Sequence, residues 1–181
     1  MNASFASVVL WSLVHAVDPS PAEVARLDAF AANVARAVDE ADALPFTGPA
    51  AREGSIAALL VTSWHESGMH ADVIECRRNG DHGQSITAWQ LRRPWAWRGH
   101  TREELCGSVR IAAGTALAVL VVHSDRGLTP GAMWRAYASG SAGIRSKAAR
   151  VMCERWAFVM SKAGIDGAAC EARKPLTWRD E

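Results

Sequence analysis

The sequence predicts a mostly helical domain with one small β-hairpin. Three features support this: long segments place apolar residues at helical spacing, Pro and Gly separate these segments, and the strict alternation typical of strands is scarce. A chain of 181 residues, 49 % of them hydrophobic, is long enough for one domain with a sizeable core. We therefore expect one helical domain without an interdomain linker.

The first 48 residues are expected to form a helical segment that packs on the rest of the domain. Residues 3–17 are apolar but too short for a bilayer-spanning helix of about 20 residues. Residues 14–16 resemble a signal-peptidase site, but no Lys or Arg precedes the apolar run, which favours a first helix of the domain over an export signal. A capping box at Ser20 then begins an amphipathic helix that ends near Ala41.

The segment that ends at Glu66 is the one around which the chain is organised. Residues 50–66 form an apolar helix whose last turn delivers Glu66 into a break at Gly68. At roughly 100° per residue, Leu59 lies on almost the same line of the helix, so the carboxyl group is expected on or beside the buried face. Apolar surroundings and the negative end of the helix dipole both raise its pKa. Acid-catalysed cleavage of a glycosidic bond requires such a carboxylic acid, protonated near neutral pH.

The longest helix is expected after the hairpin. A capping box at Thr101 begins it, and residues 125–127 end it. Its segment 111–122 is apolar nearly all round, which predicts a helix that is buried on most sides.

Two further helices and a tail complete the chain. Thr129-Pro130 opens the first, and Gly140 stops it. The second runs from about residue 142 to 163, and its inward side chains are expected to be Ile144, Val151, Trp156, Val159 and Met160. The charged tail, residues 166–181, is expected to form a loose strap.

Three short motifs follow one another in the chain: Glu66-Ser67-Gly68, residues 81–90 (Asp-His-Gly-Gln-Ser-Ile-Thr-Ala-Trp-Gln) and residues 136–140 (Ala-Tyr-Ala-Ser-Gly). This ordered set resembles the lysozyme superfamily, and within it the soluble lytic transglycosylases and goose-type lysozymes. The resemblance implies an α+β lysozyme-like catalytic domain over residues 49–165, with the hairpin beside the active-site cleft. Three positions depart from the pattern: Thr87 replaces a hairpin glycine, Ser139 stands near the expected Asn-Ala, and Arg92 stands where goose-type enzymes carry a second aspartate.

The resemblance implies a peptidoglycan-cleaving glycosidase that cuts the β-1,4 bond between N-acetylmuramic acid and N-acetylglucosamine. Glu66 would be the general acid, and Asp81 would orient a water or stabilise the transition state. Gln90 would hydrogen-bond the N-acetyl group or the acid, and Tyr137 would hold Glu66 through its hydroxyl. The side chains implied to contact substrate are Ser67, Ser85, Trp89, Gln90, Trp95, Trp97 and Tyr137.

The hydrolase and the lytic transglycosylase remain alternatives. Without a second carboxylate to position a water, the muramyl 6-hydroxyl closes on the anomeric carbon and gives a 1,6-anhydro product. Arg92, in place of an aspartate, favours this transglycosylase.

The loop after the hairpin, residues 92–98, is rich in Arg and Trp and admits two interpretations. Trp95 and Trp97 would stack on sugar faces while Arg side chains meet muramyl or peptide carboxylates. Alternatively, the two Trp side chains fill the edge of the core.

The four cysteines, Cys76, Cys106, Cys153 and Cys170, lack the C-x-x-C spacing of zinc or redox sites. Pairing of Cys76 with Cys106 and of Cys153 with Cys170 would bracket one loop each, and four reduced thiols are the alternative. A zinc hydrolase is disfavoured because His65 and His70 lie five residues apart, where a metal-binding helix needs four. No metal and no cofactor are expected.

The formal net charge of +1 and the lack of a basic run argue against nucleic acid as a partner. The resemblance implies peptidoglycan strands as the ligand and, as a further partner, a secretion-system, phage or envelope protein. The expected location is the bacterial cell envelope or a phage particle. The alternative function is a catalytically silent lysozyme-like protein that binds the cell wall or assists virion or secretion-system assembly.

Overall fold

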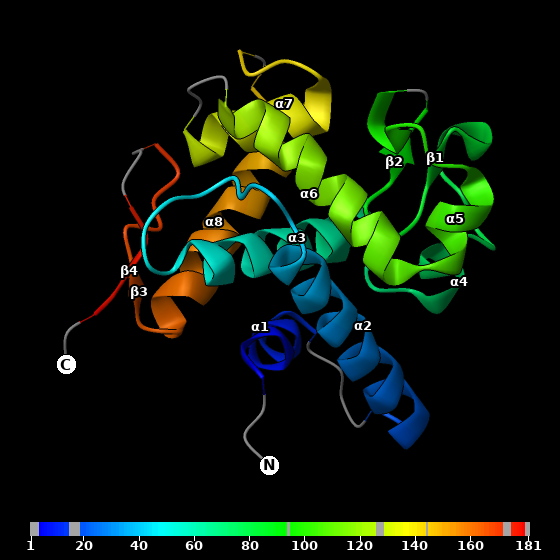
Figure 1. The fold of residues 1–181 in the computed structure, drawn as a ribbon, viewed down its shortest axis with the longest axis horizontal. Helices are drawn as coiled ribbons and strands as arrows, with labels where there is room; N and C mark the ends of the chain where they lie inside the picture. The colour runs from blue at the N-terminus through cyan, green and yellow to red at the C-terminus, as the bar shows by residue number, and fades with distance from the viewer. Residues whose placement is uncertain are drawn as a thin grey trace.

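Helix α3 (Ala51–Ser67) crosses the centre of the molecule, and the other long helices pack around it (Figure 1). The computed structural model describes residues 4–14, 19–93, 95–125, 129–143, 145–171 and 175–179. The side chains of Asp81, Asp125 and Trp178 lie outside this description, as do the predicted inward residue Ile144 and the signal-peptidase-like end of the first apolar run. The described part is mostly helical with a small antiparallel hairpin, which confirms the predicted fold class.

The N-terminal segment consists of two helices, α1 (Phe5–Leu13) and α2 (Pro21–Asp39). As predicted, Ser20 begins α2, because its side-chain oxygen accepts a hydrogen bond from the backbone N–H of Glu23. Both helices pack on α3 through fully buried side chains such as Leu10 and Leu27. One continuous buried cluster contains residues from the N-terminal segment, from the central region and from the tail.

The predicted long helix after Thr101 is wrong in one respect, because the chain breaks at Ser108. The break separates α5 (Arg102–Gly107) from α6 (Val109–Asp125). Ser108 has an extended backbone, with φ −144° and ψ 109°, and its hydroxyl accepts a hydrogen bond from the backbone N–H of Ile111. A Ser side chain that caps a new helix in this way competes with continuation of the previous one.

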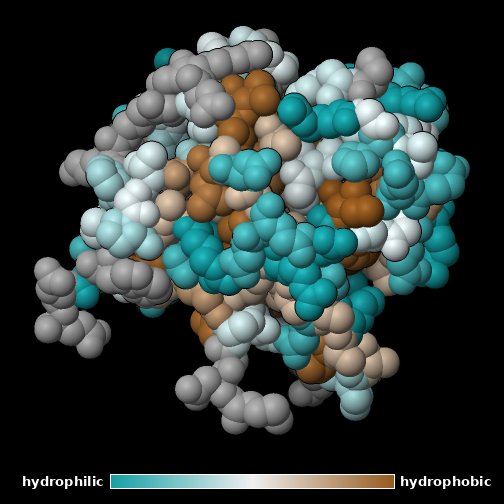
Figure 2. All heavy atoms as spheres, viewed as in Figure 1, coloured by the Kyte–Doolittle hydropathy of each residue, from teal (hydrophilic) through white to brown (hydrophobic). Residues whose placement is uncertain are grey.

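Helix α6 is less enclosed than its apolar sequence predicts. One side of it, together with the end of α2 and the loop after it, lines a groove of about 610 Å³. Figure 2 shows hydrophobic side chains among hydrophilic ones on the face of the molecule where α6 lies in front. The half-buried apolar residues of α6 that line the groove are Ile111, Ala118, Val121 and Val122.

Helices α7 (Pro130–Ser139) and α8 (Lys147–Lys162) follow, and Gly140, with φ 74°, ends α7 as predicted. Helix α8 begins later than predicted because the Ser146 side chain caps it by accepting from the backbone N–H of Ala149. Its inward side chains, where described, are buried at Trp156, Val159 and Met160 and half-buried at Val151.

The predicted loose tail is wrong, because residues beyond Asp166 are tied to the core. Strand β3 (Ile165–Asp166) pairs with β4 (Thr177–Trp178) in an antiparallel sheet. Leu176 is buried and exchanges backbone hydrogen bonds with Thr47 and Ala50, at the start of α3. The tail therefore links the end of α8 to the beginning of the central helix.

The hairpin and its surroundings form the other end of the molecule, with α4 and α5 beside them (Figure 1). Strands β1 (Ser85–Ile86) and β2 (Leu91–Arg92) are antiparallel, with Ser85 opposite Arg92. The flanking elements are α4 (Ala71–Ile74) and the 3₁₀ turns η1 (Asp81–Gly83) and η2 (Trp95–Trp97). Within the described ranges, no helix combines the length and apolarity needed to cross a membrane.

Candidate active site

A cleft of about 490 Å³ lies where the three motifs of the sequence meet. The end of α3 contributes Glu66, the hairpin contributes Ser85 and residues 89–92, and the end of α7 contributes Tyr137 to Gly140. These segments are far apart in the chain and share this one cavity. The lining residues are Glu66, Ser85, Trp89, Gln90, Leu91, Arg92, Trp95, Ala96, Val119, Tyr137, Ala138, Ser139 and Gly140.

The turn after Glu66 is fixed by its own backbone and by Ser67. Gly68 and Met69 both adopt left-handed conformations, with φ 58° and 60°, which end α3 abruptly. The Ser67 hydroxyl donates to the carbonyl of Ser63 at 2.6 Å and accepts from the N–H of Met69 at 3.2 Å. Ser67 is therefore buried at the end of the helix and is not among the described residues that line the cleft, so its expected contact with substrate stays a prediction.

The Glu66 carboxyl group has the environment that its sequence context predicts. Burial raises its pKa from the ordinary value of 4.5 to about 7, because the charged form loses solvation. At neutral pH a large fraction of the group is therefore protonated. Glu66 nevertheless reaches the cleft, where it can transfer a proton to a ligand.

Tyr137 connects α7 to the hairpin. Its hydroxyl donates to the main-chain oxygen of Trp89 at 2.6 Å, where the resemblance implied Glu66 as the partner. Burial and the nearby charge of Glu66 raise the pKa of Tyr137 well above 10, so the phenol stays neutral. The single hydroxyl proton of Tyr137 is donated to the Trp89 carbonyl, so Tyr137 does not donate a hydrogen bond to Glu66. Tyr137 instead helps to shape the cleft beside Glu66.

Two of the three tryptophans expected to contact substrate belong to the core. Trp89 is 1 % exposed, stacks on Phe30 with centroids 5.4 Å apart, and donates from Nε1 to the carbonyl of Leu59 at 2.9 Å. Trp97 is 5 % exposed and donates to the carbonyl of Leu91 at 2.8 Å. Burial of both rings argues against stacking on a sugar, but Trp89 lines the cleft whereas Trp97 does not, and their expected contacts with substrate stay predictions.

Trp95 differs from its neighbour Trp97. Its side chain is 52 % exposed and lines the cleft, and the His123 ring packs against it edge-on with the centroids 6.2 Å apart. An exposed indole supported from one side offers a flat apolar surface to a ligand. Of the two interpretations of the Arg- and Trp-rich loop, stacking fits Trp95 and core filling fits Trp97.

The Gln90 side chain hydrogen-bonds to the turn of the hairpin. Its backbone is left-handed, with φ 48°, and its Nε2 donates to the carbonyl of Thr87 at 3.1 Å. Gly80 makes room for this amide, because a Cβ there would lie 2.3 Å from Oε1 of Gln90. Thr87 has φ 67°, a conformation that strains a β-branched residue.

Ser85 is 5 % exposed and lines the cleft, as its expected contact with substrate requires. Asp81 lies in η1 at the start of the hairpin, but its side chain is outside the described structure. Its proposed role therefore stays a prediction.

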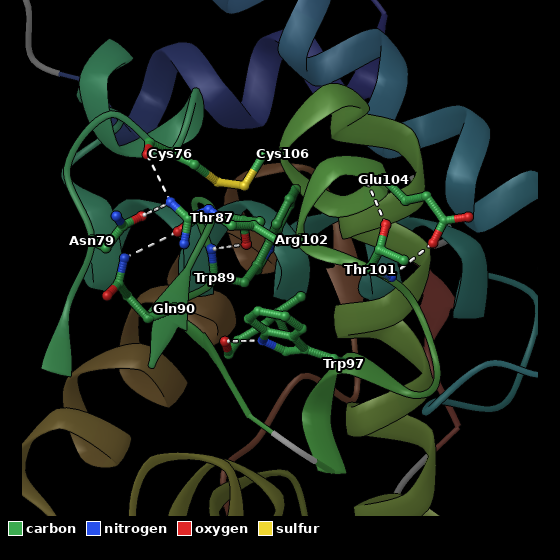
Figure 3. Close-up of a disulfide and its surroundings, with 11 residues drawn as sticks. Cys76, Asn79, Thr87, Trp89, Gln90, Trp97, Thr101, Arg102, Glu104 and Cys106 are labelled. Atoms are coloured by element: carbon green, nitrogen blue, oxygen red, sulfur yellow. Dashed lines mark hydrogen bonds between the residues drawn. A yellow bond between two sulfur atoms is a disulfide. The ribbon is translucent and has the colours of Figure 1, made fainter. Parts of the chain in front are cut away.

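A disulfide between Cys76 and Cys106 anchors the hairpin region to α5 (Figure 3). Arg102 of α5 donates to the carbonyl of Cys76 at 3.2 Å and to the side-chain oxygen of Asn79 at 3.1 Å. Cys153 and Cys170 form the second disulfide. Both predicted pairings are confirmed, and the alternative of four reduced thiols is wrong for this structure.

The disulfide also makes the sulfur of Cys76 unavailable as a zinc ligand. The pKa of His65 is lowered, mainly by burial and to a lesser degree by the positive charge of Arg155. In the described part of the chain, no three side chains of His, Cys, Asp or Glu gather closely enough to hold a metal ion.

Some residues that line the cleft were not predicted as site residues from the sequence. Val119 of α6 reaches the cleft, although its helix reads as uniformly apolar. Arg92 was noted in the sequence as a departure from the resemblance and residues 138–140 belong to the third motif, but none of the four was predicted to line the cleft. Comparison of the chain with protein-family models, with curated proteins and with solved structures finds no match.

Proposed function

We propose that this protein is a glycosidase that cleaves peptidoglycan at the β-1,4 bond between N-acetylmuramic acid and N-acetylglucosamine, with Glu66 as the general acid. One observation carries the proposal: the three motifs line one cleft, and the acid among them has a pKa of about 7. A buried carboxyl group without a role would only destabilise the fold, whereas a general acid requires this environment.

The chemistry needs one proton donor at the glycosidic oxygen. Glu66 transfers its proton to that oxygen as the bond from the anomeric carbon to the oxygen breaks, and the leaving sugar departs as an alcohol. Positive charge then develops at the anomeric carbon and ring oxygen. The Glu66 carboxylate left behind lies beside this charge.

The nucleophile of the second step is the 6-hydroxyl of the muramyl sugar, assisted by its N-acetyl group. The hydroxyl oxygen bonds to the anomeric carbon and its proton passes to the Glu66 carboxylate, which restores the acid and leaves a 1,6-anhydro end. A pKa near 7 suits a group that acts first as acid and then as base. Arg92, where a second carboxylate would be needed to activate water, supports this route over hydrolysis.

Trp95 supports a carbohydrate ligand independently of Glu66. It is a half-exposed indole at the cleft edge, and flat aromatic surfaces are suited to the apolar faces of sugar rings. Trp95 and Glu66 line the same cleft, so a sugar chain that stacks on Trp95 can also reach the acid.

Digestion of purified peptidoglycan by the wild-type protein and by Glu66→Gln tests the proposal. The amide keeps the volume of the side chain but cannot donate the proton, so the rate should fall at least ~10²–10⁴-fold. Glu53→Gln is the matched control, because Glu53 lies in the first turn of the same helix. Wild-type protein that leaves peptidoglycan intact, or Glu66→Gln protein with near-normal turnover, would contradict the proposal.

A further inference from the structure

Arg92 gives the cleft a fixed positive charge. Among the described lining residues, the ionisable side chains are Glu66, Tyr137 and Arg92. The Glu66 carboxyl, with a pKa of about 7, is largely neutral below that pH, and Tyr137 stays neutral because its pKa is raised well above 10. A guanidinium group is charged throughout this range. The described lining is therefore cationic in mildly acidic and neutral solution.

The hairpin directs Arg92 toward the ligand. Arg92 lies opposite Ser85 in the antiparallel pair, and residues opposite each other place their side chains on the same face of a sheet. Both residues line the cleft. The Arg92 guanidinium donates to Oε1 of Gln84 at 3.5 Å, near the limit of a hydrogen bond, so most of its five N–H groups can still serve a ligand.

The adjacent Arg93 has a structural role in this loop. Arg93 places its guanidinium carbon 4.6 Å from the centroid of the Trp97 ring, a cation–π contact with a core side chain. Arg93 does not belong to the described cleft lining. The two neighbouring cations are thus matched in charge and exposure but differ in their access to the cleft.

We infer that Arg92 makes the cleft selective for glycans whose sugars carry a carboxylate over neutral glycans with the same backbone. This inference rests on the proposed function and specifies its substrate class. A guanidinium binds a carboxylate through two parallel hydrogen bonds, a geometry that amide or hydroxyl substituents do not reproduce. In peptidoglycan the lactyl group of muramic acid ends in a free carboxylate only where no stem peptide is attached, so the inferred substrate is the peptide-free glycan strand.

A matched pair of ligands tests this selectivity. One is the peptide-free glycan strand, whose lactyl groups end in carboxylates, and the other is the same strand after its carboxylates are coupled to methylamine. Dissociation constants are measured in the Glu66→Gln background to prevent turnover, and cleavage rates are measured with Glu66 present. Each is measured with Arg92, with Arg92→Gln, with Arg92→Lys and with the control Arg93→Gln.

The acidic strand should bind about tenfold more tightly than the amidated strand, and high salt should shrink this ratio. Arg92→Gln should reduce the ratio to about one, Arg92→Lys should retain part of it, and Arg93→Gln should retain all of it. Equal affinities for the two strands, or a preference that survives Arg92→Gln, would overturn the inference while cleavage by the wild-type protein still supports the proposed function. A preserved preference without any cleavage would overturn the proposed enzymatic function alone.

Discussion

Replacing Glu66 by Gln should make the protein more stable at neutral and alkaline pH while it removes activity. In the folded state the pKa of Glu66 is raised from 4.5 to about 7. The folded protein therefore holds this proton more tightly than the unfolded chain does. The resulting stability is fully present below pH 4.5 and is lost as pH rises through about 7.

The size of the effect follows from the two pKa values. Their difference corresponds to a change of about 3 kcal/mol in the free energy of unfolding if solvent screening is ignored. Glu66 is half-buried at the edge of a cleft, so solvent screening reduces the expected effect to about 1–2 kcal/mol. Gln does not titrate. The free energy of unfolding of Glu66→Gln, relative to the wild-type protein, should therefore rise by about 1–2 kcal/mol between pH 4 and pH 8.

Urea unfolding of the two proteins at several pH values measures this difference directly. Glu53→Gln serves as the control, since it removes a carboxylate at the other end of the same helix. A difference between Glu66→Gln and wild-type protein that stays constant from pH 4 to pH 8 would show that Glu66 titrates at its ordinary pKa. Glu66 would then be too weakly protonated at neutral pH to serve as the general acid there.

Three other outcomes follow from the same site. The rate of peptidoglycan cleavage should fall as pH rises through about 7, because the protonated form of Glu66 is lost, and a rate that increases across that range would contradict the role of the acid. Trp95→Ala should weaken binding of chitooligosaccharides by about 1 kcal/mol with little change in melting temperature, whereas Trp97→Ala should cost about 3–5 kcal/mol of stability; calorimetry and thermal unfolding of both variants separate the two effects. Asp81→Asn should keep most of the activity if the nucleophile belongs to the substrate, and complete loss of activity in folded protein would favour a water-activating carboxylate.

The helices were predictable because their signals are local. Ser20 and Thr101 cap helices in the structure as their spacing from Glu23 and Glu104 predicts. The break at Ser108 was missed because a single Ser, even after Gly107, also occurs inside helices. The bound tail was missed because Leu176 is held by backbone pairing with residues more than 120 positions earlier, which no local pattern reveals.

The sequence predicts the position and environment of Glu66 but not which tryptophans line the cleft. The raised pKa of Glu66 depends on its place at the end of an apolar helix, and both the helix and its end can be recognised in the sequence. The three tryptophans could not be sorted in the same way, because Trp serves equally in a core and at a surface. Only the partners Phe30 and Leu91 identify Trp89 and Trp97 as buried side chains.

Mass spectrometry of the products of peptidoglycan digestion tests the central claim most directly. If Glu66 protonates the leaving oxygen and the muramyl 6-hydroxyl then attacks, the released fragments should end in 1,6-anhydro-muramic acid, one water lighter than reducing ends, and Glu66→Gln should release none. Reducing ends alone would show that water is the nucleophile and would contradict the transglycosylase route. Intact peptidoglycan after incubation with folded wild-type protein would contradict the claim that the protein cleaves this polymer at all.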